Sequence, residues 1–358
     1  LARYDVPSCF HIPQRLYGRE NEIDALLATF ARVASGQKDM LLVSGYSGIG
    51  KTVLVREIHK PITERLGYFV AGKFDALQPT PYAAVLTAFR ELVRQLLSES
   101  DSRLAEWRNQ LTAALGSSGQ AIIDLIPELE WIVGPQPVMP ELNPAEAENR
   151  FYRIVRNFVR VFCQPEHPLV VFLDDLQWAD AGSLKLLESL MTDEAIAHLL
   201  LIGAYRDHEV SAGHPLLVAL QTLQLQGIVS RQIKLAPLDF ESTGQLLADT
   251  LNRDPETLAP LAELVAHKTA GNPFFIKTFL KSLHREQQLL FDTRQGVWQW
   301  DIAQIQTQPS TGNVIELLAN RIRHLPDTMQ DALKRAACLG GRFDPNTLAC
   351  ASDATVRD

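Results

Sequence analysis

The sequence predicts an α/β fold in which a parallel β-sheet is covered by helices on both faces. Short apolar runs typical of buried strands recur along the chain, and segments with helical spacing of apolar residues lie between them. One of the runs leads directly into a glycine-rich loop. The expected strands are residues 40–44, 68–74, 169–174, 199–205 and 231–235. Strands that alternate with helices in this way are joined by crossover connections and therefore run parallel.

The glycine-rich loop follows the first expected strand and reads Gly45-Tyr46-Ser47-Gly48-Ile49-Gly50-Lys51-Thr52. It fits the P-loop pattern G-x-x-x-x-G-K-[ST], which arises by accident in about one chain in a hundred of this length. Glycines let backbone N–H groups turn inward around an anion, and the helix that begins near Lys51 directs the positive end of its dipole there. The residues expected to bind the nucleotide are Gly45, Ser47, Gly48, Ile49, Gly50, Lys51, Thr52 and Val53.

Two side chains of this loop carry the chemistry. Lys51 is expected to reach the β- and γ-phosphates and to take part in catalysis, and the Thr52 hydroxyl is expected to bind Mg²⁺. The loop therefore predicts a site for ATP or GTP together with magnesium.

A second informative segment is the apolar run 168–173, which ends in the carboxylates Asp174 and Asp175. A central strand has this form when its carboxyl end meets a metal ion. We expect Asp174 to hold Mg²⁺ through water and Asp175 to orient the attacking water. The alternative is a buried strand followed by an aspartate-rich turn without a catalytic role.

A third buried run, 199–205, is followed by Arg206. Ligands of open α/β sheets bind at the carboxyl ends of the strands, so Arg206 is expected to contact the γ-phosphate. A structural ion pair with Asp207 or Glu209 is the alternative. The neighbouring Asp207-His208-Glu209 resembles a metal cluster, but a solvated charged loop is the favoured interpretation because no partner ligands are evident elsewhere.

Two further segments are candidates to frame the base of the nucleotide. Tyr17-Gly18-Arg19-Glu20 precedes an amphipathic helix, and Gly271-Asn272-Pro273 opens another helix. Arg19 and Pro273 are therefore included among the expected nucleotide-binding residues. On spacing alone, each segment is also simply a helix start.

The order of the elements predicts a linker over 1–15, a nucleotide-binding domain over 16–238 and a helical lid over 239–288. The segment 289–358 is expected to hold a β-hairpin and an incomplete final domain. The expected helices are 82–97, 104–115, 145–163, 240–252, 255–269, 273–288, 313–324 and 327–339, and the hairpin spans 289–302. Five prolines between 127 and 144 predict an extended connector on the surface.

Bulk properties are those of a globular protein, with 46% apolar and 21% charged residues. No apolar run is long enough to span a membrane, residues 1–13 carry no targeting signal, and four scattered cysteines favour a reducing, cytoplasmic setting. The net charge of -8 makes nucleic acid an improbable partner. Because the chain begins with Leu1, we expect it to be a piece of a larger protein.

These motifs in this order resemble the STAND class of P-loop ATPases, which are signal-transduction NTPases related to the AAA+ group. The resemblance is carried by Tyr17-Gly18-Arg19-Glu20, the P-loop, the strand end 173–180, Arg206 and Gly271-Asn272-Pro273. More narrowly, residues 42–59, 69–75 and 126–129 resemble the ATPase module inside large bacterial hybrid kinases. In those proteins a Ser/Thr kinase domain precedes the module, and sensor and histidine-kinase domains follow it.

The resemblance implies a five-stranded parallel sheet in the order 5-1-4-3-2, a helical lid and the start of a winged-helix domain. It also implies that Pro273 touches the nucleotide, that Arg206 is the first sensor, and that ADP holds the module closed whereas ATP permits opening and self-association. The sequence departs from the class in showing no assignable second sensor arginine and no Met-His-Asp motif. Asp175 is shorter than the glutamate of many AAA+ enzymes, which predicts slow hydrolysis.

The leading hypothesis is an ATP-binding, slowly hydrolysing switch with ATP or ADP and Mg²⁺ as cofactors. It would relay its nucleotide state to attached kinase, sensor or histidine-kinase domains. One alternative is an ATP-dependent transcriptional regulator that binds DNA, although no basic recognition helix is evident in 311–358 despite Arg321, Arg323, Lys334 and Arg335. A small-molecule kinase is a further alternative, but no acceptor pocket is evident and such an enzyme needs no lid-plus-hairpin extension.

Overall fold

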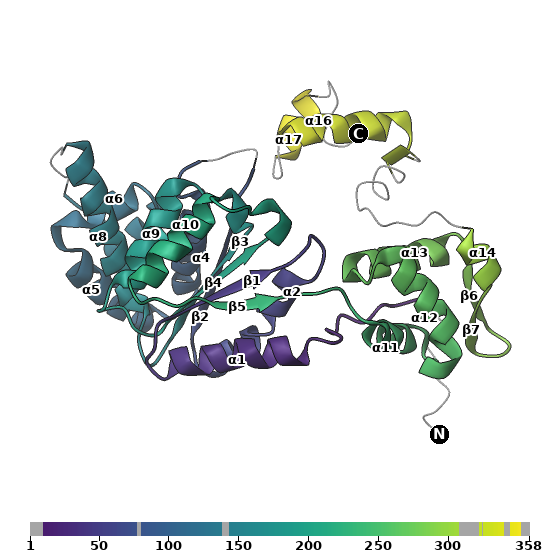
Figure 1. The fold of residues 1–358 in the computed structure, drawn as a ribbon. Helices are drawn as coiled ribbons and strands as arrows, with labels where there is room; N and C mark the ends of the chain where they lie inside the picture. Colours follow the sequence, from purple (N-terminus) through teal and green to yellow (C-terminus); the bar gives the residue numbers. More distant parts are fainter. Residues whose placement is uncertain are drawn as a thin grey trace. The chain divides into compact units, whose positions relative to one another are not determined.

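A computed structural model of the chain describes residues 10–76, 80–137, 143–307, 322–323, 325–339 and 344–351. These residues form two compact units. The first unit holds 21–47 and 51–235, and the second holds the described residues of 1–20, 48–50 and 236–358. Each unit is described separately below (Figure 1).

The first unit is built on a five-stranded sheet. Its strands are β1 (Asp39–Ser44), β2 (Tyr68–Lys73), β3 (Leu169–Asp174), β4 (Leu199–Tyr205) and β5 (Arg231–Lys234). They are hydrogen-bonded in the order β2-β3-β4-β1-β5, and every pair is parallel. The predicted order 5-1-4-3-2 is the same order counted from the other edge, so the predicted sheet is confirmed.

The central strands β1, β3 and β4 are buried along almost their whole length, as expected for a parallel sheet covered on both faces. The connection from β1 to β2 runs along the sheet in the opposite direction to the later connections. Because crossovers are right-handed, this reversal places the helices after β1 on one face and the later helices on the other. Because β1, β3 and β4 are parallel, their carboxyl ends lie at the same edge of the sheet.

Helix α1 (Glu20–Ala34) precedes β1, and the other helices of the first unit lie in the connections between the strands. These helices are α2 (Lys51–Arg56), α3 (His59–Glu64), α4 (Ala83–Leu97), α5 (Asp101–Leu115), α6 (Gly119–Ile123), α7 (Glu130–Val133), α8 (Pro144–Phe162), α9 (Ala181–Thr192) and α10 (Pro215–Leu225). The largest core cluster joins alternate strand residues such as Leu42 and Val171 to Phe89 of α4 and Phe158 of α8. It packs α4, α5, α8, α9 and α10 against one face.

The prediction of an extended surface connector over the proline-rich segment is wrong for residues 127–133, whereas the described residues 134–137 lie outside helices and strands, with Pro135 and Pro137 exposed. A short 3₁₀ turn, Pro127–Leu129, leads into α7, and Leu129 and Ile132 are buried in the main core cluster. Proline is tolerated in the first turn of a helix, where no intrahelical acceptor awaits its missing N–H group. Pro144 occupies this position in α8, which Asn143 caps by accepting a hydrogen bond from the Glu146 N–H group.

The second unit is mainly helical. Its elements are α11 (Phe240–Leu251), α12 (Pro255–Thr269), α13 (Pro273–Arg285), the antiparallel strands β6 (Leu289–Asp292) and β7 (Val297–Trp300), α14 (Ile302–Gln306), α16 (Asp327–Leu339) and α17 (Pro345–Ala351). The first three helices and the hairpin bury a core of their own around Phe279 and Trp298. They confirm the predicted lid helices and hairpin as elements.

Other predictions for this region are not tested. Most of the expected helix 313–324 lies outside the described residues. Within this range the structure describes residues 322 and 323, and both are helical. The winged-helix expectation falls on the same region and stays a prediction, as do the four domain boundaries. Among the described residues, no helix has the length and apolar character needed to cross a membrane.

The packing of α4 on β2 generates a stability prediction. A Cβ atom added at Gly72 of β2 would lie 1.9 Å from the backbone oxygen of Ala84 in α4, which cannot move without displacing the helix. We expect Gly72→Ala to lower the free energy of unfolding by about 1–3 kcal/mol, measured by chemical denaturation.

Gly203→Ala is the control, because its Cβ would meet side-chain atoms of Leu176 and Leu42 rather than backbone, so its loss should be smaller. Equal losses in the two variants would contradict the argument from backbone contact.

Candidate functional site

The P-loop has the backbone geometry of an anion cradle. It leaves the end of β1 and enters α2 at Lys51. Gly45, Gly48 and Gly50 have φ angles of 147°, 76° and 108°. Residues with a Cβ rarely adopt these angles, so glycine is required for this path. The predicted loop and the helix after it are therefore present as the sequence indicated.

Lys51 lies inside the curve of this loop. Its Nζ atom donates hydrogen bonds to the backbone oxygens of Gly45 and Tyr46, at 2.8 and 3.0 Å. Burial lowers the pKa of Lys51, and the nearby charges of Asp174 and Asp175 act in the opposite direction. A partly desolvated cation in this position favours an anionic ligand, because a phosphate oxygen can replace the carbonyl partners.

Thr52 and Asp174 come together although they lie far apart in the sequence. The Thr52 Oγ1 atom donates a hydrogen bond to Asp174 Oδ2 at 3.1 Å. Mg²⁺ prefers oxygen ligands and binds them at about 2.0–2.1 Å in an octahedral arrangement. A hydroxyl and a carboxylate at this separation can share one coordination sphere, directly or through a coordinated water. The donor set therefore fits a magnesium ion.

Asp175 is held by several groups in a buried position. It has a left-handed backbone with φ of 56° and ψ of 45°, and only 4% of its surface is exposed. Its carboxylate lies 2.9 Å from Lys73 Nζ and accepts a hydrogen bond from Gln177 Nε2 at 3.0 Å. Burial would raise the pKa of Asp175, but the hydrogen bonds from Lys73 and Gln177 and the positive charges of Lys73 and Arg206 outweigh it and lower the pKa. The carboxylate is thus firmly ionised.

Arg206 follows β4 and lies beside the same carboxylate. Its Nε atom is 3.6 Å from Asp175 Oδ1, and its Nη1 atom donates to Glu209 Oε1 at 2.7 Å. The guanidinium also lies over the Trp178 ring, 5.0 Å from the centroid. The ion pair with Glu209 that the sequence left open is therefore present. The role of Arg206 as a γ-phosphate sensor stays a prediction.

The sequence interpretation missed Lys73 and Gln177. Lys73 is the last residue of β2 and is in register with Asp174 of β3. The predicted strand order placed β2 next to β3, so a cation at the carboxyl end of β2 was a usable signal. Gln177 lies in the 3₁₀ turn Leu176–Trp178 after β3, and its direction depends on that turn.

The charged residues of the loop after Arg206 contact neighbouring side chains. His208 lies 4.0 Å from Asp207 and 3.7 Å from Glu209, and its ring stacks on Tyr46. Lys234 of β5 pairs with Asp207 at 3.4 Å. Within the described part of the chain, no group of three or more His, Cys, Asp or Glu residues could hold a metal ion. The interpretation of this loop as solvated charge stays a prediction.

Arg19 and Pro273 belong to the second unit. Arg19 donates a hydrogen bond from Nη2 to the backbone oxygen of Ala236. Pro273 is the first residue of α13, and Asn272 caps this helix by accepting a hydrogen bond from the Phe274 N–H group at 3.0 Å. The helix-start interpretation of this segment is confirmed. Contact of either residue with a nucleotide stays a prediction.

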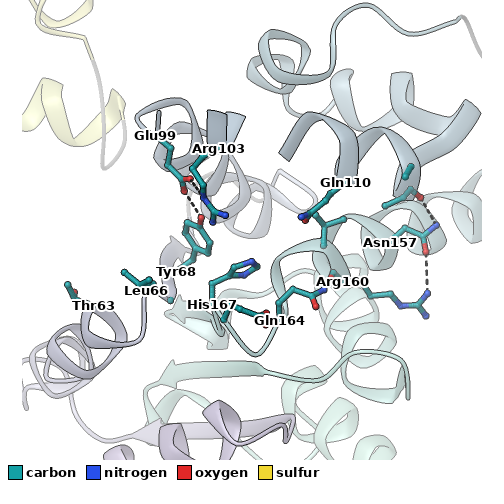
Figure 2. A pocket seen from close by; sticks show the side chains of 15 residues that line it. Thr63, Leu66, Tyr68, Glu99, Arg103, Gln110, Asn157, Arg160, Gln164 and His167 are labelled. Carbon is teal, nitrogen blue, oxygen red and sulfur yellow. Dashed lines mark hydrogen bonds and ion pairs between the residues drawn. The ribbon is translucent and has the colours of Figure 1, made fainter. Parts of the chain in front are cut away.

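A separate cavity of about 1200 Å³ opens in the first unit at the amino ends of β2 and β3 (Figure 2). Tyr68 and Glu99 line it and share a hydrogen bond of 2.5 Å, and His167 lies beside them. None of the residues predicted for nucleotide binding or catalysis lines this cavity. It therefore lies apart from the group formed by Lys51, Thr52, Asp174, Asp175 and Arg206.

Solved structures similar to this chain include the ORC2 protein of Aeropyrum pernix, with a TM-score of 0.47, 15% sequence identity, and coverage of 96% of this chain and 81% of that chain. Another is a Signal Transduction ATPase with Numerous Domains (STAND) protein with a tetratricopeptide repeat sensor from Pyrococcus horikoshii. Its TM-score is 0.44 at 13% identity, covering 96% of this chain and 38% of that chain.

Similar proteins include the hybrid signal transduction histidine kinase G of Dictyostelium discoideum, 30% identical over 98% of this chain. The peroxide stress-activated histidine kinase mak3 of Schizosaccharomyces pombe is 20% identical over 94% of this chain. The chain spans 12% and 18% of the lengths of these two relatives. It thus corresponds to one part of much longer proteins.

A family model described as the AAA ATPase domain matches residues 15–202, which is more than half of the chain. The matched segment includes the P-loop, Lys73 and the aspartates Asp174 and Asp175 at the end of β3. These are the residues that the fold gathers at one edge of the sheet. The chain belongs to the AAA ATPase domain family.

Proposed function

We propose that this chain is an ATP-binding, slowly hydrolysing switch that relays its nucleotide state to attached signalling domains. The observation that carries the proposal is the hydrogen bond between Thr52 and Asp174, next to the cation of Lys51. Two magnesium-type ligands and a phosphate-binding lysine at the end of a P-loop suit a nucleoside triphosphate with Mg²⁺. Membership of the AAA ATPase domain family favours ATP over GTP.

Slow turnover is proposed from the surroundings of Asp175. In the proposed role this carboxylate orients the attacking water, while Lys51 and Arg206 stabilise charge on the phosphates. The Asp175 carboxylate is paired with Lys73 and Arg206 and accepts a hydrogen bond from Gln177. These contacts lower the pKa of Asp175, which makes it a weak base. An aspartate also reaches less far than a glutamate. Both factors limit hydrolysis, which suits a switch whose states must persist.

The signalling output is proposed from the relatives. The two similar proteins named above are histidine kinases, and the chain matches only a small part of each. Attached kinase, sensor or histidine-kinase domains are therefore the proposed partners, with nucleotide-dependent self-association as a second mode, in the cytoplasm. We further propose that Arg19 and Pro273 contact the nucleotide.

Removing the Lys51 ammonium tests nucleotide binding. Lys51→Ala is expected to weaken ATP binding about 10- to 150-fold, because a charge-assisted hydrogen bond contributes about 1.5–3 kcal/mol. Isothermal titration calorimetry measures the change. Lys60→Ala, at an exposed lysine of α3, should bind ATP like the wild type. Unchanged affinity in Lys51→Ala would refute the proposed site.

The magnesium assignment predicts a different pattern at Thr52. Thr52→Val keeps the shape of the side chain but removes the oxygen, so the Mg²⁺ concentration needed for half-maximal hydrolysis should rise about tenfold or more. Thr52→Ser retains the hydroxyl and should respond to Mg²⁺ much like the wild type. Steady-state assays over a magnesium series make the comparison, and identical curves for the valine and serine variants would argue against Thr52 as a ligand.

A substitution at Asp175 is expected to affect hydrolysis of ATP without affecting its binding. Asp175→Asn keeps the size of the side chain but cannot act as a base, so single-turnover hydrolysis should fall about 100-fold or more while ATP affinity changes little. Rapid-quench measurement of released phosphate checks the rate. Hydrolysis at the wild-type rate would show that another group orients the water.

A further inference from the structure

We propose that Gln177 is a positioning residue that joins the carboxylate of Asp175 to the end of β4, so that Arg206 and Asp175 shift together. The inference deepens the proposed ATPase function and rests on it. It assigns a role to an amide side chain that itself touches neither phosphate nor metal in the proposed scheme.

The Gln177 amide makes two hydrogen bonds in opposite directions. Its Nε2 atom donates to Asp175 Oδ1 at 3.0 Å, and its Oε1 atom accepts from the Arg206 backbone N–H group at 3.2 Å. The orientation of the amide follows from its partners, since an ionised carboxylate can only accept and a backbone N–H can only donate. Glutamine is the residue that satisfies both partners at once.

Burial makes this bridge strong. Only 5% of the surface of Gln177 and 4% of that of Asp175 are exposed, so water competes poorly for either partner. Lys73, which also pairs with this carboxylate, has a side chain that is 60% exposed, and solvent weakens its ion pair. Gln177 is thus a more rigid restraint on Asp175 than Lys73.

Packing also ties the turn that carries Gln177 to β4. Leu176 lies directly over Gly203, where an added Cβ would come within 2.2 Å of its Cδ1 atom. Trp178 lies under the guanidinium of Arg206. Each residue of the turn Leu176–Trp178 therefore contacts β4 or Arg206, which follows it. Gln177 is the residue whose contact is a hydrogen bond.

The consequence concerns how Arg206 could influence hydrolysis. A movement of Arg206 toward a γ-phosphate would pull on its own backbone, and the Gln177 amide would pass that displacement to the Asp175 carboxylate. Since a misplacement of about 1 Å can cost about 100-fold in rate, a small shift is enough to change turnover. The bridge would make hydrolysis depend on the position of Arg206.

Three variants test the bridge. Gln177→Met removes both hydrogen bonds with little change in size, whereas Gln177→Glu keeps the acceptor for the Arg206 N–H group but turns a carboxylate oxygen toward Asp175. Lys73→Met is the matched control, because it removes a partner of Asp175 that makes no hydrogen bond to Arg206. The measurements are ATP affinity by calorimetry, single-turnover hydrolysis, and hydrogen exchange of the Arg206 amide without nucleotide.

The expected result is a distinct signature for each variant. Gln177→Met should hydrolyse ATP about 10- to 100-fold more slowly with an ATP affinity within about threefold of the wild type, and its Arg206 amide should exchange about tenfold faster. Gln177→Glu should lose hydrolysis to a similar extent but keep the amide protected. Lys73→Met should leave exchange of the Arg206 amide unchanged.

Hydrolysis within twofold of the wild type in Gln177→Met would overturn the proposal, and so would unchanged exchange of the Arg206 amide. If Gln177→Met does not fold, Gln177→Glu decides, and a parallel loss of affinity and turnover there would also overturn it. Failure of the proposed function gives a different pattern. The wild type would then not hydrolyse ATP, while the exchange measurement would still report whether Gln177 holds Arg206.

Discussion

Parallel hydrogen bonding of β1, β3 and β4 brings the ends of three strands to one edge of the sheet, and the whole candidate site depends on this alignment. The P-loop continues from β1, Asp174 ends β3 with Asp175 after it, and Arg206 follows β4. The hydrogen bond from Thr52 to Asp174 spans β4, which lies between their strands in the sheet. An antiparallel arrangement would send these groups to opposite edges, so the chemistry follows from strand direction.

Charge compensation is the second feature that organises this edge. Asp175 is buried, and a buried carboxylate is costly unless it is paired and hydrogen-bonded. Lys73 and Arg206 supply positive charge to it, and Gln177 supplies a neutral hydrogen bond. Lys51 remains bonded to carbonyl oxygens of its own loop. The carboxylate is therefore already stabilised, whereas the lysine of the P-loop has only neutral hydrogen-bonding partners.

Much of the fold was predictable, because its signals are local. The five strands read as apolar runs, and the helix starts carry recognisable caps such as Asn272 before Pro273. The part of the proline-rich segment that folds as helix was mispredicted because proline density was read as a barrier to any helix. The penalty applies to helix interiors, and Pro127 and Pro144 each occupy a first turn. The helical turns of this segment bury Leu129 and Ile132, and the apolar character of these two residues was the sequence signal against an exposed connector.

The sequence by itself determined the P-loop and the carboxylates at the end of a buried strand, because each depends on residues adjacent in the chain. The strand order followed from the resemblance that a specific set of motifs carries. Only the tertiary structure decided which groups hold Asp175. Lys73 comes from the neighbouring strand, and Gln177 reaches both Asp175 and the Arg206 backbone because a 3₁₀ turn directs it there. Such contacts depend on the register of paired strands and on side-chain direction, and neither leaves a periodic pattern in the sequence.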